Sequence, residues 1–121
     1  MIETLRLEHD VRAPRRARHW IIQRCDEWQC GALADSAALM VTELVTNAFL
    51  HARTDCVVHA AFTAPTLRVT VTDEDSREIS AKSLSHTEER GRGLVIIAAL
   101  ADTWGVEHHA GTKSVWFDLS G

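Results

Sequence analysis

The sequence predicts a two-layer α/β (α+β) sandwich, with helices on one face of a mixed, mostly antiparallel sheet. Strand-like runs come in pairs separated by turn residues, a pattern typical of hairpins. Strands and helices do not alternate along the chain as they do in parallel α/β proteins. Two segments carry apolar residues at helical spacing, and each must bury that side against another element. The 121 residues are enough for one domain, 1–121, with a single core.

The first half of the chain predicts one strand and two helices. Residues 2–9 alternate apolar and polar side chains, as a strand does. Residues 14–29 begin with a proline that suits a first helical turn, and apolar residues then recur at helical spacing. Residues 36–52 show the same spacing, and Asp35 or Ser36 can cap the helix that they form.

The second half predicts two hairpins with a loop and a helix between them. Residues 74–90 have no sustained periodicity, and a loop of that length in a compact domain is usually functional or disordered. Residues 91–102, "GRGLVIIAALAD", predict a short apolar helix that glycines open. The four predicted strands are 56–63, 66–73, 103–109 and 113–119.

Composition excludes several classes of protein. The net charge of −4 argues against binding of nucleic acid or acidic membranes as the main activity. No apolar run reaches membrane-spanning length, and the first residues lack the order of a signal peptide, so a cytoplasmic protein is expected. The three cysteines form no CxxC pair and the seven histidines are scattered or adjacent, which favours reduced, mostly buried thiols over a zinc site.

The helix predicted over residues 36–52 carries three polar side chains at intervals of four. On a helical wheel, Asn47 lies about 40° and His51 about 80° from Glu43, at the edge of the apolar stripe. An acid and an amide at this edge would face a cleft beside the core. The alternative is a solvated helix edge, because polar pairs four residues apart are common on helices.

An acid ends one predicted strand on its apolar side. In "TLRVTVTD", side chains alternate between faces, so Asp73 shares a face with Val69 and Val71. Burial of a carboxylate without a partner is costly, so a specific donor is expected beside Asp73. The alternative is that Asp73 only caps the following loop, a common position for aspartate.

The segment "RGRGL", residues 90–94, has the composition of a phosphate site. Gly91 and Gly93 would let backbone N–H groups approach a ligand at a helix N-terminus, which carries roughly half a positive charge. Arg90 and Arg92 add positive charge there. The alternative is that glycines begin the helix for steric reasons. Together with the acid–amide pair and the buried acid, the segment predicts a nucleotide site.

These segments resemble the motifs of the GHKL (Bergerat-fold) ATPase superfamily, which has the histidine-kinase-like ATPase fold. Within it, the chain is most similar to the small anti-sigma factor serine kinases and related actinobacterial ATP-binding regulators. The resemblance covers nearly the whole chain. "ELVTNAFLHA" resembles the N box, which implies that Glu43 is the general base and that Asn47 coordinates Mg²⁺ bound to the phosphates.

The remaining boxes follow in the same order along the chain. "VTDED" resembles the first glycine box, whose aspartate, here Asp73, accepts the adenine amino group. "GRGL" resembles the second glycine box, with Gly91, Gly93 and Leu94 at the start of the phosphate-facing helix. "GTKSVWF" resembles the closing strand motif, with Ser114 in the place of a hydroxyl residue near the adenine.

The resemblance implies a serine/threonine-protein kinase that uses ATP and Mg²⁺. Under a lid of approximately residues 74–92, it would transfer the γ-phosphate to a small anti-sigma factor antagonist. Glu43 would take the hydroxyl proton, and Arg90 or Arg92 would offset the developing charge. The same fold would sequester a sigma factor, so its partners would be proteins, with no direct contact to nucleic acid or a membrane.

Two other readings compete with the kinase. The first glycine box normally reads D-x-G-x-G, whereas residues 73–77 read "DEDSR" without a glycine. A protein-interaction module that is gated by nucleotide, or that binds none, is therefore the main alternative. The ATPase half of a two-component histidine kinase is disfavoured, because no dimerising phospho-acceptor helix precedes the domain.

Strand parity places Trp116 opposite to Val115 and Phe117, on the outer face of the sheet. Relatives of this type often dimerise through the sheet side, so a homodimer that uses Trp116 is one hypothesis. The alternative is a half-exposed aromatic residue on a strand, without a partner protein.

Overall fold

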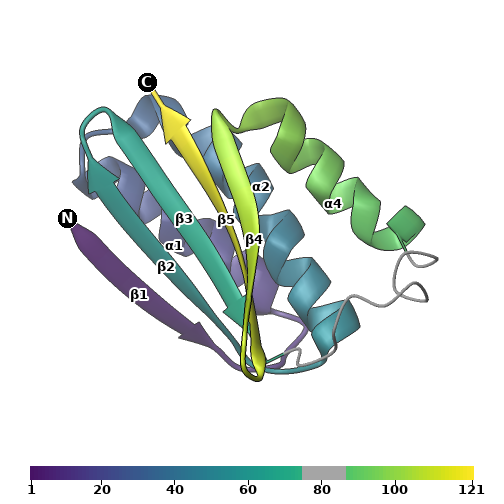
Figure 1. The fold of residues 1–121 in the computed structure, drawn as a ribbon. Coiled ribbons are helices and arrows are strands. Elements are labelled where there is room, and N and C mark those ends of the chain that lie inside the picture. Colours follow the sequence, from purple (N-terminus) through teal and green to yellow (C-terminus); the bar gives the residue numbers. More distant parts are fainter. Residues whose placement is uncertain (75–86) are drawn as a thin grey trace.

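A five-stranded sheet forms one layer of the protein and helices form the other (Figure 1). The structure is a computed structural model that describes residues 1–74 and 87–121, without the side chains of residues 87–93. The predicted two-layer sandwich is confirmed, and every strand pair of this sheet is antiparallel. The spatial order is β1 (Ile2–Leu7), β2 (Cys56–Thr63), β3 (Thr66–Asp73), β5 (Thr112–Ser120) and β4 (Thr103–His109).

The strands pair as the sequence predicts. β2 and β3 form a hairpin across Ala64-Pro65, and β4 and β5 form the second hairpin. β5 lies between β3 and β4. After β3, the chain therefore first forms the edge strand β4 and then β5, which fills the position between β4 and β3. This arrangement sets the end of β3 beside the start of β5, where Asp73 faces Lys113 in register.

The helices α1 (Ala13–Glu27), α2 (Ala34–Asn47) and α4 (Thr87–Leu100) lie on one side of the sheet (Figure 1). A 3₁₀ turn, η1 (Gly31–Leu33), leads into α2, and a π-helical turn, η2 (Ala48–Ala52), continues it. α2 packs against α1, α4 and β3, so it is the central helix of the layer.

The predicted cap of the second helix is wrong. Leu33 occupies the N-cap position and no side chain bonds to the end of the helix. The 3₁₀ turn supplies the entry instead, because it places Asp35 inside the first turn rather than before it. There the carboxylate still complements the positive end of the helix dipole.

The core lies between the inner face of the sheet and the helices. Phe117, Val69 and Val58 from the strands are fully buried against Ile21 and Val41 from the helices. In β3 and β5, buried residues alternate with residues that are mostly half-buried, which follows the period of two that the sequence predicts. Cys25, Cys30 and Cys56 are free and buried, as expected for reduced thiols.

The helical stretch Gly31–Ala52 has the length and composition of a membrane span, with a mean hydropathy of 1.3. In this structure, however, Met40, Val41 and Val45 from the same stretch are fully buried in the core. Core helices of soluble proteins meet the same criteria, so the stretch is weak support for a membrane location.

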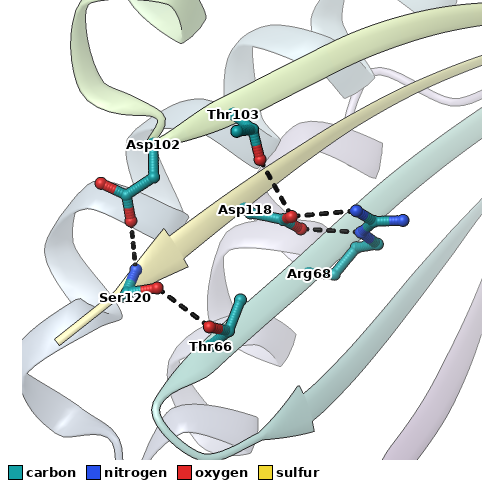
Figure 2. Close-up of polar contacts among 6 residues, drawn as sticks. All are labelled: Thr66, Arg68, Asp102, Thr103, Asp118 and Ser120. Atoms are coloured by element: carbon teal, nitrogen blue, oxygen red, sulfur yellow. Dashed lines mark hydrogen bonds and ion pairs between the residues drawn. The ribbon is translucent and has the colours of Figure 1, made fainter.

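Polar side chains link the strands on the uncovered face of the sheet (Figure 2). Arg68 donates two hydrogen bonds to Asp118, at 2.7 and 2.9 Å, and Thr103 donates a third at 3.0 Å. The Arg68 hydrogen bonds lower the pKa of the Asp118 carboxyl below its usual value. The guanidinium also stacks 4.2 Å from the ring of Trp116, which therefore lies on the uncovered face as predicted. The indole covers Gly105, where an added Cβ would stand 2.8 Å from it.

Candidate functional site

The central helix α2 carries the acid and the amide predicted for the site. Glu43 and Asn47 are both half-buried, between the buried residues Leu44 and Ala48 and the solvent-exposed side of the helix. This position agrees with the edge of the apolar stripe that the helical wheel predicts. α2 contacts both β3 and α4, which are the elements that carry the other two motifs.

The helix changes form directly after Asn47. The α-helical hydrogen bonding gives way to the π-helical turn η2, which ends at Arg53 with a left-handed backbone (φ 57°). The wheel drawn for an ideal α-helix therefore holds for Glu43 and Asn47 but not for His51, which lies in the wider turn. π-turns of this kind occur frequently at functional sites.

His9 holds this turn from outside the helix. Its Nε2 donates to the carbonyl oxygen of Phe49 at 3.0 Å, and its ring stacks on Phe49 with centroids 4.6 Å apart. The backbone N–H of His9 donates to Asp55 at 2.8 Å. The loop after β1 is thereby tied to η2 and to the residue directly before β2.

Asp73 is buried at the end of β3, with 4% of its surface exposed. Its carboxylate faces the Nζ atom of Lys113 at 3.5 Å, and the two residues are register partners on β3 and β5. The sequence predicts a buried acid with a specific donor, and the structure supplies the donor. The end of β3 also lies close to the segment that follows η2, because Thr54 accepts a hydrogen bond from the backbone N–H of Glu74 at 3.1 Å.

Ser114 does not share a face with Asp73. Its hydroxyl lies 2.7 Å from the hydroxyl of Thr72 on the uncovered face of the sheet. Adjacent strand residues point to opposite faces, so the residue of β5 beside Asp73 is Lys113. The structure therefore does not bring Ser114 together with the other predicted site residues.

The phosphate motif lies at the N-terminal part of α4. This helix begins at Thr87, so Gly91 and Gly93 lie within it and do not open it. The side chains of Arg90 and Arg92 lie outside the described residues, as does most of the predicted lid. Leu94 is half-buried and packs against the core, which fixes the position of this part of the helix.

A small pocket of about 130 Å³ adjoins Asp73 at the end of the sheet. It is smaller than the roughly 300–1,000 Å³ of most small-molecule sites. Several of its residues come from the uncovered face, so it does not lie on the side of the sheet that α2 covers. It is lined by Arg6, Asp55, Val57, Thr72, Asp73, Glu74 and Thr112.

The surroundings of Asp73 are buried and include a second carboxylate, that of Asp55. Cys56 is its register partner on β2 and is buried beside it. Burial, reinforced by the carboxylates of Asp73 and Asp55, raises the pKa of the Cys56 thiol to about 11. The ammonium of Lys113 therefore offsets a local excess of negative charge.

Sequence reasoning missed His9 and Lys113. His9 carries no local signal, because its partner Phe49 is distant in the sequence and lies in a π-turn. Strand alternation could have predicted the position of Lys113. It lies two and four residues before Val115 and Phe117, which both face the core, so its side chain is on the same face.

The sequence matches the family described as "Histidine kinase-like ATPase domain" over residues 7–119. A crystal structure of the RsbU and RsbW domains of Rv1364c from Mycobacterium tuberculosis matches the fold with a TM-score of 0.76 at 19% sequence identity. That match covers 99% of this chain and 32% of the other, so the chain spans about a third of the length of that protein. No match was found among curated proteins.

The family match covers nearly every described element, from the end of β1 to the end of β5. It confirms the resemblance to the GHKL ATPases that the motifs indicate, and the match to a structure with an RsbW domain agrees with it at the level of the fold. The chain therefore belongs to the histidine kinase-like ATPase domain family.

Proposed function

We propose that the protein binds ATP with Mg²⁺ and transfers the γ-phosphate to a serine or threonine of a small antagonist protein. In its other role it binds a sigma factor, which it releases or captures according to the state of the antagonist. These are cytoplasmic activities. Membership of an ATPase domain family supports nucleotide binding, and the fold match to a structure with an RsbW domain supports the regulatory role.

One observation carries the proposal. α2, with half-buried Glu43 and Asn47, packs against β3, which ends at buried Asp73, and against α4, which carries the glycine motif. Three motifs far apart in the sequence thus lie in elements that adjoin one another. An isolated polar helix edge or a simple loop cap does not require this convergence.

The residues fit a magnesium ion that is held mainly by its nucleotide. Among the side chains of residues 1–74 and 94–121, no group of three His, Cys, Asp or Glu could form a metal site. Mg²⁺ commonly keeps several waters and binds one or two protein oxygens plus substrate phosphates. The amide oxygen of Asn47 is such a hard ligand, and the bound ion would neutralise phosphate charge.

Glu43 serves as the general base in this proposal. Its carboxylate accepts the proton of the substrate hydroxyl while that oxygen bonds to the γ-phosphorus. The bond from the γ-phosphorus to the bridging oxygen breaks, and ADP leaves. Asp73 accepts a hydrogen bond from the adenine amino group and so fixes the base. Catalysis then rests on positioning and charge stabilisation, as in other phosphoryl transfers.

Calorimetric titration with ATP and Mg²⁺ tests the site directly. We expect binding by the wild-type protein and a loss of about tenfold or more in Asn47→Ala, because a metal ligand is removed. Gln23→Ala is the matched control, since it deletes an exposed amide from α1. Equal affinities in all three proteins would contradict the assignment of Asn47.

A protein-interaction module that is gated by nucleotide, or that binds none, and that has no kinase activity is the second candidate. It is favoured by the missing glycines after Asp73, because glycine permits close approach of a ligand to the backbone. Incubation with γ-labelled ATP and candidate antagonist proteins separates the two. Label on the partner that disappears in Glu43→Gln supports the kinase, whereas partner binding without label supports the module.

A further inference from the structure

We propose that Lys113 reads the base of the bound nucleotide together with Asp73. Its ammonium donates a hydrogen bond to N1 of adenine. This ring nitrogen lies next to the amino group whose hydrogen bond Asp73 accepts. The inference rests on the proposed function, since it requires an adenine nucleotide at Asp73. It gives a specificity role to a residue that the sequence motifs leave unassigned.

The backbone fixes the pair in place. Asp73 and Lys113 are direct register partners in the β3–β5 ladder, where Cβ atoms lie about 4.5–5.5 Å apart. The Nζ atom of Lys113 lies 3.5 Å from the Asp73 carboxylate, and the side chains are only 14% and 5% exposed. A surface lysine samples many positions, but this one is held at the predicted base site.

The two charged groups form an acceptor beside a donor. An ionised carboxylate only accepts hydrogen bonds, and an ammonium only donates them, with three N–H groups. The matching edge of adenine has the reverse order, an amino donor next to a ring-nitrogen acceptor. Guanine in the same orientation would set its carbonyl against Asp73 and its ring N–H against Lys113, so the pair selects adenine.

A purely electrostatic role for Lys113 predicts different behaviour. If the ammonium only neutralised Asp73, it would compete with the adenine amino group for the carboxylate. Its removal would then tighten nucleotide binding. A donor to the ring nitrogen predicts weaker binding after its removal, and only for ligands that have that nitrogen.

The test compares ATP with 1-deaza-ATP, in which a C–H group replaces that ring nitrogen. Calorimetric titrations of both nucleotides with Mg²⁺ are run on the wild-type protein and on Lys113→Met. We expect the wild type to bind 1-deaza-ATP about tenfold more weakly or worse, the effect of losing a hydrogen bond to a charged donor. Lys113→Met should bind the two nucleotides within about twofold of each other.

Ser114→Ala is the matched control, because Ser114 is the next residue and points to the opposite face. In this variant, the ratio of the dissociation constants of 1-deaza-ATP and ATP should equal that of the wild type. If Lys113→Met alone does not fold, the double variant Asp73→Asn/Lys113→Met is used, because it removes both buried charges. It too should bind ATP and 1-deaza-ATP with similar dissociation constants.

Two results overturn the role of Lys113. One is the same preference for ATP over 1-deaza-ATP in the wild type and in the Lys113 variant. The other is tighter binding of ATP by Lys113→Met. A folded wild-type protein that binds neither nucleotide would instead refute the proposed function, and the role of Lys113 with it.

Discussion

The buried pair of Asp73 and Lys113 predicts a strong thermodynamic coupling. The perturbations are Lys113→Met, Asp73→Asn and the double variant. Opposite unit charges 3.5 Å apart attract by about 5 kcal/mol at an effective dielectric constant of about 20. Much of this attraction is offset by desolvation, so the pair itself stabilises the fold far less. Removal of one partner, however, leaves the other charge buried.

The expected free energies follow from the burial of each group. Lys113→Met leaves the carboxylate of Asp73, which is 5% exposed, without its cation, and should cost about 3 kcal/mol. Asp73→Asn keeps an acceptor oxygen, so it should cost about 2 kcal/mol. The double variant should cost about 2 kcal/mol or less, because no buried charge is left. The coupling energy is then about 3 kcal/mol.

Urea denaturation followed by tryptophan fluorescence measures all four proteins without any nucleotide. Domains of this size have unfolding free energies of about 5–15 kcal/mol, so the single variants should stay folded. The reasoning would be refuted if the loss of unfolding free energy in the double variant equalled the sum of the two single losses to within about 0.5 kcal/mol. Such additivity means that the two groups do not interact. The result is independent of the proposed function.

Three further predictions concern other parts of the sheet. Gly105→Ala should destabilise the protein by about 1–3 kcal/mol, since its Cβ would clash with the indole of Trp116, as thermal unfolding will test. Arg68 lowers the pKa of Asp118 in the folded protein. The Asp118 carboxylate therefore adds to the free energy of unfolding at neutral pH, and this stabilisation is lost as the pH falls from about 4 toward the lower, folded-state pKa. Asp118→Asn should therefore flatten that part of the stability curve measured by denaturation at each pH. Cys56, with a pKa of about 11, should react with iodoacetamide at pH 8 far more slowly in the folded than in the urea-unfolded protein, as mass spectrometry will measure.

Most of the fold could be predicted because its signals are local. Strand-like runs on either side of the turn signal Ala64-Pro65 located β2 and β3 at their observed bounds, and helical spacing located α1 and α2 to within a few residues. The departures arise where local rules compete with packing. The 3₁₀ turn before α2 and the π-turn after it change the entry and exit of a helix whose interior the sequence predicts well.

The candidate site was only partly predictable, for a physical reason. Glu43 and Asn47 can be paired from sequence, because helical spacing fixes their relation within one element. The partner of Asp73 depends on which strand lies beside β3 and in which register, and sequence spacing contains neither. Parity alone could have placed Ser114 on the face opposite to Asp73, since Trp116 was assigned to the outer face and the two residues share that face.

The two faces of β5 are linked through its register. A shift by one residue would move Lys113 to the uncovered face and bury Ser114, because side chains alternate along a strand. Fully buried Phe117 resists such a shift from the core side, and the hydrogen bonds of Arg68 to Asp118 resist it from the other. The polar network in Figure 2 therefore does more than link neighbouring strands. It helps to fix the strand position that sets Lys113 against Asp73, so the outer face supports the chemistry proposed for the inner one.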